Sequence, residues 1–275
     1  MGKALIFDGL NVQNPIQTIN FEIEDLDATR IAGCFANITS TQQSAIKKLV
    51  KSLKAAGTFD KLSYLILPVI AGNVDEAIRN VMVDSDSIPS TTYMSLADNL
   101  LFISKAVDVT NYIKPNTLNT TNISAGIFAD FEVESVPSGM YSETIVKINT
   151  GHILYRDGNN GCCFHDGTNG SHSKTYSQGK GKYGISSDID EMQSIMVYGN
   201  KNTSDTYSVA SFSIDPTGTI TATDTASVIL SSSGTGPSYR TFTGGYKLLW
   251  VSSLLTETEL VAMHKAFDEF VTSIS

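Results

Sequence analysis

Residues 246–273 read "YKLLWVSSLLTETELVAMHKAFDEFVTS" and combine the signals of a strand with those of a helix that follows it directly. The first eight residues are rich in the aromatic and aliphatic side chains of a buried strand. Thr256 and Glu259 then have the spacing of a capping box. Apolar positions follow at helical spacing: Leu260, His264, Phe267, and Phe270 or Val271. We therefore expect a strand followed by one amphipathic helix of about four turns.

Upstream of this stretch, from about residue 99, apolar and polar side chains alternate in short runs. "AGIFADFEVES" (125–135) places Phe128, Asp130 and Glu132 on one face of a strand, the pattern of a half-exposed sheet. "HILYRDGNNGCCFHDG" (152–167) indicates two short strands around a Gly-Asn turn. Turn signals at this density favour an antiparallel β-sandwich or barrel and disfavour a βαβ sheet.

Two helices are predicted ahead of the strands. The first is expected to have Asp27 as its N-cap, with Leu26 and Ile31 packed across it as a hydrophobic staple. The second begins with a capping box of Thr39 and Gln42 and carries an apolar stripe, while its lysines fall mostly elsewhere. Both helices are short, so we expect them to pack against the rest of the chain.

The order of these signals predicts four units. Residues 1–22 form an N-terminal arm, 23–72 a helical hairpin with a buried strand, 73–98 a connector, and 99–275 the β-sandwich with its C-terminal helix. The buried strand is expected within 58–72, where Gly57 ends the second helix and Pro68 breaks the strand.

The composition excludes several classes of protein. Nineteen Lys and Arg against 28 Asp and Glu give a net charge of −9, so binding to nucleic acid or to an anionic membrane surface is not expected. No apolar run is long enough to span a bilayer, and "MGKALIFDGLN" lacks the features of a secretion signal. We expect folding in a cytoplasm, with the three cysteines reduced.

Residues 26–72 resemble an N-terminal module of many tailed-bacteriophage virion proteins. The matching positions are Ile38, Thr39, Gln42, Gln43, Ala45, Ile46, Leu49, Val50, Leu53, Lys54, Gly57, Phe59, Lys61, Pro68 and Gly72. One departure is the turn after the strand, which here reads Ala71-Gly72-Asn73 where the family has Gly-Gly-Thr. Residues 242–273 resemble the ending of laminin-G-like and concanavalin A-like jelly rolls.

These resemblances imply a mainly β protein built on a jelly roll, acting as a tail, fibre or capsid-surface component of a phage particle made in a bacterial cytoplasm. Such proteins usually have no assigned catalytic residues, so the chain is not expected to be an enzyme. The arm would attach to other virion proteins through its apolar residues: Leu5, Ile6, Phe7, Val12 and Ile16. Virion proteins of this kind are commonly symmetric homo-oligomers, and we expect a trimer.

A host-surface glycan is one ligand that the outward face of the sandwich could bind. Tyr155, Tyr176 and Tyr183 could stack on sugar rings, and Asp157 and Asp166 lie in or beside polar turns. Trp250 is expected in the core, because Leu248 and Leu249 precede it.

No cofactor is expected, although the jelly-roll resemblance leaves calcium open. A soft metal held by Cys163 and His165 also stays open, since both would share a strand face. A host-glycan receptor and a polysaccharide depolymerase remain as alternative functions. The depolymerase would use carboxylates from Asp130, Glu132 and Glu134.

Overall fold

The structure is a computed structural model that describes twelve stretches of the chain. These are residues 25–83, 94–103, 123–131, 143–148, 151–157, 161–164, 174–175, 181–188, 193–200, 208–213, 227–231 and 244–274. The predicted arm at 1–22, with Leu5, Ile6, Phe7, Val12 and Ile16, lies outside these residues, as do Asp166 and Tyr176.

Helices and turns occupy the two ends of the described chain. They are α1 (Leu26–Ala32), α2 (Ser40–Ala55), α3 (Val74–Ala77) and α4 (Glu257–Ile274), with the 3-10 turns η1 (Phe59–Lys61) and η2 (Pro68–Ile70). None of the helices in the described stretches is both long enough and apolar enough to cross a membrane.

The strands are β1 (Leu62–Ile66), β2 (Met94–Ala97), β3 (Leu100–Ile103), β4 (Ile123–Phe131), β5 (Glu143–Ile148), β6 (Gly151–Asp157), β7 (Gly161–Phe164), β8 (Lys174–Thr175), β9 (Gly181–Asp188), β10 (Gln193–Asn200), β11 (Ser208–Ser213), β12 (Ser227–Ser231) and β13 (Gly244–Ser253). They form an eight-stranded sheet in the order β11-β10-β9-β4-β13-β3-β2, with β1 also paired to β13, and a five-stranded sheet in the order β12-β5-β6-β7-β8. Every strand pair is antiparallel. The predicted antiparallel β architecture with flanking helices is therefore confirmed.

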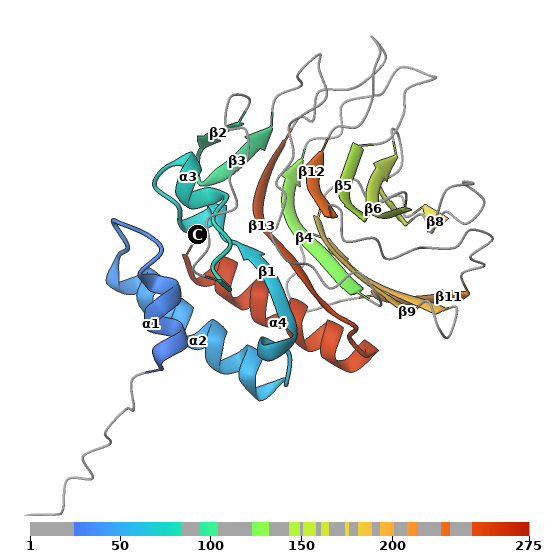
Figure 1. The fold of residues 1–275 in the computed structure, drawn as a ribbon, viewed down its shortest axis with the longest axis horizontal. Helices are drawn as coiled ribbons and strands as arrows, with labels where there is room; N and C mark the ends of the chain where they lie inside the picture. Colours follow the sequence, from blue (N-terminus) through green and yellow to red (C-terminus); the bar gives the residue numbers. More distant parts are fainter. Residues whose placement is uncertain are drawn as a thin grey trace, which may run out of the picture.

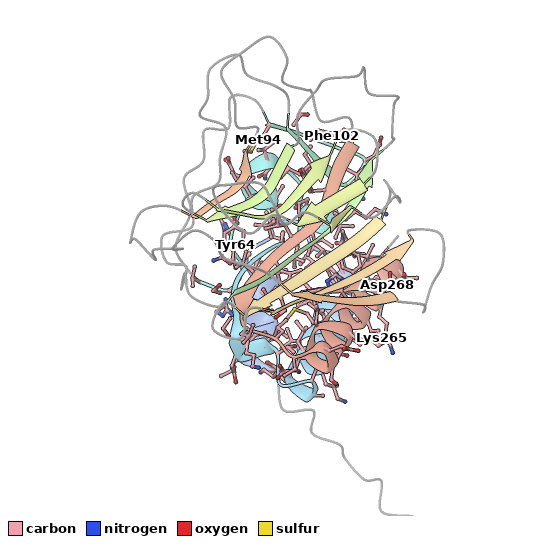
Figure 2. The ribbon with its side chains drawn as sticks, turned by 90° about the vertical axis from the view of Figure 1, so that its right-hand side faces the viewer. Tyr64, Met94, Phe102, Lys265 and Asp268 are labelled. Atoms are coloured by element: carbon pink, nitrogen blue, oxygen red, sulfur yellow. The ribbon has the colours of Figure 1, made fainter. Side chains whose placement is uncertain are left out.

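The larger sheet separates the helices from the smaller sheet. Helices α2 and α4 lie side by side along one face of the larger sheet, and the strands of the smaller sheet lie on the other (Figure 1). Figure 2 shows the same layers after a quarter turn, with Lys265 and Asp268 marking α4 and with Met94 and Phe102 marking the β2–β3 hairpin. Contacts of β6 with β4 and β9 bring the two sheets together.

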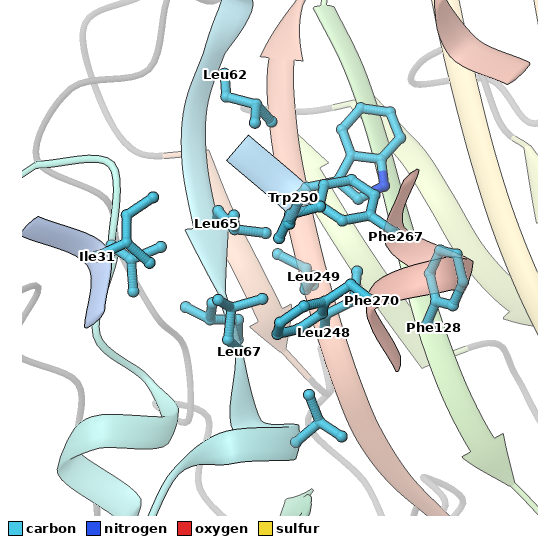
Figure 3. Close-up of a cluster of buried hydrophobic side chains, with 14 of the residues drawn as sticks. Ile31, Leu62, Leu65, Leu67, Phe128, Leu248, Leu249, Trp250, Phe267 and Phe270 are labelled. Carbon is cyan, nitrogen blue, oxygen red and sulfur yellow. The ribbon is translucent and has the colours of Figure 1, made fainter. Parts of the chain in front are cut away.

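Strand β13 is the centre of the core. It pairs with β4, β3 and β1, and its residue Trp250 lies opposite Gly126 and Leu65. The Trp250 side chain is fully buried, as predicted, and its indole stacks on the ring of Phe267 in α4 at 6.3 Å (Figure 3). Because β1 follows α2 in the chain, its pairing with β13 joins the two ends of the sequence in a single core.

The two predicted capping boxes are both formed. Thr39 N donates to Gln42 Oε1 at 2.9 Å, and Gln42 N donates to Thr39 Oγ1 at 3.2 Å. At the start of α4, Thr256 N donates to Glu259 Oε2 at 3.0 Å, and Glu259 N donates to Thr256 Oγ1 at 3.3 Å. Gly57 has φ +68°, so it follows α2 in the left-handed conformation that glycine adopts most easily.

The predicted start of α1 is wrong by two residues. Asp25 is the N-cap, and its Oδ1 accepts from Asp27 N at 3.0 Å and from Ala28 N at 3.3 Å. Leu26 is 79% exposed while Ile31 is buried, so the expected hydrophobic staple is absent from this helix. The Lys54 ammonium of α2 binds both Asp25, at 2.9 Å, and Asp27, at 2.6 Å, so Asp27 forms an ion pair within the first turn while Asp25 caps the helix.

Candidate functional site

The candidate sugar-binding residues fall on strands of different sheets. Tyr155 and Asp157 lie in β6, and Tyr183 lies in β9. The predicted hairpin is confirmed, because β6 and β7 pair with Tyr155 opposite Cys163 and Asp157 opposite Gly161. Tyr183 pairs with Tyr198 in β10 and Ile127 in β4. The structure thus brings the strands of Tyr155 and Tyr183 together, since β6 contacts β9.

The side of the larger sheet that faces α4 is a packed core. Gly184 of β9 lies so close to α4 that a Cβ atom there would overlap the imidazole of His264. The His264 ring stacks on Phe128 of β4 at 5.3 Å and meets the indole of Trp250 edge-on at 5.6 Å. Phe128 and His264 are both fully buried. This layer therefore has a structural role, and a surface site must lie elsewhere.

The exposed strand face predicted around Phe128 is therefore wrong. The alternation in residues 125–135 is real, but Phe128 is 1% exposed because α4 covers it. Helix α4, which covers Phe128, is distant in the sequence, so the local alternation of residues does not predict this burial. Of the carboxylates proposed for a depolymerase, Asp130 lies in β4 opposite Gly245, and Glu132 and Glu134 lie outside the described residues.

Two serines beneath the β13–α4 connection form a buried polar cluster that no local sequence pattern predicts. Ser124 Oγ donates to Ser186 Oγ at 2.8 Å, and Ser186 Oγ donates to the Leu255 carbonyl at 2.6 Å. The backbone N–H of Leu255 donates back to both hydroxyls, at 3.0 and 3.1 Å. The cluster satisfies the peptide groups of a buried turn and so fixes where α4 begins.

A second buried polar cluster surrounds Glu76 of α3. Its carboxylate is 7% exposed and accepts from the backbone N–H groups of Gly72 at 2.8 Å and Ala36 at 3.1 Å. Asn73 Oδ1 accepts from the Glu76 N–H at 2.9 Å and so caps α3. The turn at 71–73 therefore joins the α1–α2 loop to the segment after β1.

Charged side chains hold α1 against α2. Lys54 Nζ lies 2.9 Å from Asp25 Oδ1 and 2.6 Å from Asp27 Oδ2. The hydrogen bond from Lys54 is the main cause that lowers the pKa of Asp25 below 3.8. The bonds to Asp27 and Asp25 in turn raise the pKa of Lys54 above 10.5.

A third ion pair links η1 to α4. Lys61 Nζ lies 2.8 Å from Glu259 Oε1 and also donates to the Leu254 carbonyl at 3.4 Å. Burial favours a higher pKa for Glu259, but the bonds from Lys61 and Thr256 outweigh it and lower the pKa below 4.5.

Within the described stretches, His, Cys, Asp and Glu side chains form no group of three or more that could hold a metal ion. Of the candidate soft-metal pair, Cys163 lies in β7 and His165 lies outside the described residues.

No family model matches this sequence, and no curated protein matches it either. Among solved structures, the Trypanosoma rangeli sialidase in complex with 2,3-difluorosialic acid aligns with 83% of this chain at 10% identity and TM-score 0.48. The same sialidase with 2,3-difluoro-KDN gives TM-score 0.47. A mutant of the GH43 protein BlXynB from Bacillus licheniformis aligns with 60% of this chain and 35% of its own, at 14% identity and TM-score 0.36.

This chain spans about 40% of the length of the sialidase chains that it is similar to, at 40% and 39% in the two complexes. The prediction that this chain is not an enzyme is contradicted, because the solved structures to which it is similar are sialidases and a GH43 protein. That prediction relied on the resemblance to virion proteins, which usually have no assigned catalytic residues. Likeness at this level assigns no activity to the chain.

Proposed function

We propose that this chain is a structural component of a tailed-phage virion, located in the tail, a fibre or the head surface. Its two sheets would form a concanavalin A-like jelly roll that faces outward. Residues 1–22 would attach it to other virion proteins, and the particle form would be a homo-oligomer, with three copies as the expected number.

The relative placement of α1 and the smaller sheet carries this proposal. The arm enters the molecule at α1, which packs on α2, and α2 packs on α4 beneath the larger sheet. The smaller sheet, with β6, lies on the opposite side of the larger sheet (Figure 1). A chain held at α1 would therefore present β6 away from its attachment point, as an outward-facing virion domain requires.

The test is the presence of the protein in intact particles. Antibodies raised against the purified full chain should label phage particles released by the bacterium whose DNA encodes the chain. Electron cryomicroscopy should then locate the label on the particle. A chain lacking 1–22 that keeps its circular dichroism spectrum and Tm should fail to enter particles. Particles that contain no copy of the chain by mass spectrometry would exclude the virion role.

The outward face would bind a host-surface glycan, and this function is supported by the position of Tyr155 and Asp157 on β6 beside the turn of the β6–β7 hairpin. Aromatic rings next to hydrogen-bonding groups at a sheet rim suit sugar recognition. A glycan array with the full chain tests this proposal. Binding should weaken in Tyr155→Ala and Asp157→Asn but persist in Lys47→Ala, a matched control on the exposed side of α2.

The same samples should be assayed for release of new reducing ends from capsular polysaccharide. Release that disappears in Asp130→Asn, with the fold intact, would replace the binding proposal with the depolymerase alternative. Absence of both glycan binding and release would leave an architectural role.

A further inference from the structure

We propose that α4 is an acid-sensitive element of the fold: below about pH 6.5, protonation of His264 releases the helix from the larger sheet. Release uncovers the apolar underside of α4, which includes Phe267 and Phe270. The release needs no partner, so it stands whether or not the virion proposal is correct.

The imidazole of His264 is enclosed by residues of three strands. The side chain is 0% exposed. Phe128 of β4 stacks on the ring at an interplanar angle of 28°, and Trp250 of β13 meets it at 76°. The Nε2 atom faces Gly184 of β9, where a Cβ atom would already overlap the ring. Figure 3 shows Phe128, Trp250 and Phe267 in this layer. The ring therefore reaches water only if α4 moves.

Full burial favours the neutral form of the imidazole. An ion that passes from water into a buried site loses its hydration, and for histidine this loss disfavours the protonated ring. The face of Phe128 attracts a cation and returns part of the loss. The return is the smaller effect, because one ring face replaces a complete hydration shell. The folded chain therefore holds His264 neutral.

The charged side chains of the two packed helices were considered next to the ring. Asp268 lies one turn after His264 and is 8% exposed, so its carboxylate favours an imidazolium. Lys265 is exposed to solvent. Glu269 is paired with Lys48 of α2 at 3.0 Å. Asp268 is therefore the group on these helices that works against a neutral ring.

A lysine position on the sheet opposes Asp268. Lys182 of β9 pairs with Phe128 of β4, and strand alternation places it on the same face as Gly184, toward α4. Asp130 lies two residues beyond Phe128 on that face of β4. The nearby positions of β13 and β10 on this face are uncharged: Leu248, Ser252, Ile195 and Val197. Charges of both signs thus border the ring, and its burial decides which form the folded chain holds.

Opening of α4 should therefore take up a proton. An exposed histidine binds a proton below about pH 6.5, whereas the buried ring stays neutral. The stability of the closed helix is complete above that pH and is lost as the pH falls. With one proton bound per opening, the open fraction rises by up to about tenfold per pH unit.

Hydrogen exchange of residues 257–274 in the full chain, corrected for the intrinsic effect of pH, measures this opening. From pH 7 to pH 5, protection in the wild type should fall by up to about tenfold per pH unit. The triple variant His152→Gln/His165→Gln/His172→Gln keeps His264 as its sole histidine and should behave like the wild type. His264→Gln should lose the pH dependence, because its amide does not titrate.

The carboxyl groups of Glu259 and Asp25 leave this range clear, because their pKa values are lowered from 4.5 and 3.8. Trp250, the sole tryptophan, gives a second measurement. Between pH 7 and pH 5 its emission should shift to longer wavelength in the triple variant, as water reaches the indole, and should stay constant in His264→Gln.

An equal pH dependence in His264→Gln, or none in the triple variant, would overturn the proposal. If His264→Gln does not fold, the imidazole carbon resonances of the triple variant decide. They should show a neutral ring for as long as α4 stays protected from exchange. A ring that takes up a proton while α4 remains protected would also overturn the proposal.

Discussion

His264 of α4 lies directly over Gly184 of β9, in contact so close that no side chain larger than hydrogen fits at position 184. The imidazole is held from two further directions by Phe128 and Trp250, so it has no room to withdraw. Helix α4 can therefore pack this closely on the larger sheet only because residue 184 has no Cβ atom.

Gly184→Ala should therefore destabilise the protein by about 1–3 kcal/mol, the usual cost of overpacking a core. Urea unfolding followed by circular dichroism measures the loss. The double variant Gly184→Ala/His264→Ala supplies the control, since removing the ring makes room for the new Cβ. The two changes should cost less together than the sum of the single changes. A Gly184→Ala protein as stable as the wild type would show that α4 is not seated this closely.

Glu76→Ala should cost about 2–3 kcal/mol, because it leaves the Gly72 and Ala36 N–H groups without their acceptor in a partly buried site. Asp75→Ala, one residue earlier and exposed, is the matched control and should change stability by less than about 0.5 kcal/mol. The measurement is the midpoint of urea unfolding at neutral pH. Equal midpoints for the two variants would mean that the carboxylate does not hold the α1–α2 loop.

Acid should destabilise the protein through Glu259 and Asp25. Both carboxyl groups have a folded pKa lowered below the ordinary values of 4.5 and 3.8. A lowered pKa adds stability that is complete above the unfolded value and is lost as the pH falls through the folded value. We therefore expect stability to fall below about pH 4.5, the value from which the pKa of Glu259 is lowered.

The contribution of the Lys61–Glu259 pair should be about 1 kcal/mol or less, because both side chains are partly open to water, and that of the more exposed Lys54–Asp25 pair should be smaller. Urea midpoints between pH 7 and pH 3 measure it. Lys61→Met/Glu259→Gln should flatten the part of the curve near pH 4, and Asp25→Asn, which can still cap α1, should flatten the part below it. Curves of identical shape in all three proteins would assign the acid sensitivity to other groups.

The sequence predicts features that depend on neighbours along the chain and misses those that depend on distant ones. The Thr39–Gln42 and Thr256–Glu259 caps span three residues, and both formed as expected. The contact of Lys61 with Glu259 joins positions 198 residues apart, and no local sequence pattern predicts it. Leu26 illustrates the opposite error, since the staple pattern was present while an earlier aspartate took the cap.

The candidate site follows the same division. The β6–β7 hairpin was predictable because its turn residues and strands are adjacent in sequence. The arrangement of β6 against β4 and β9 was not, because contacts between sheets depend on how both sheets are covered. The exposed-face interpretation of residues 125–135 failed for this reason: α4, more than a hundred residues later in the sequence, buries Phe128.

Asn80 completes the outer edge of β1, and its loss should have two separable effects. Its Oδ1 accepts from Leu65 N at 3.0 Å and its Nδ2 donates to the Ser63 carbonyl at 3.0 Å, so the amide pairs with the strand as a neighbouring strand would. Asn80→Ala leaves these buried backbone groups unpaired and should cost about 2–4 kcal/mol. Because an uncovered strand edge also pairs with other chains, the variant should associate with rising concentration in light scattering. Asn80→Asp keeps the acceptor for Leu65 N but places a carboxylate against the Ser63 carbonyl in a buried site, so it should also lower stability, yet it should associate less than Asn80→Ala because the Leu65 bond is retained. If the alanine variant were destabilised yet stayed monodisperse, the amide would stabilise the fold without protecting the edge.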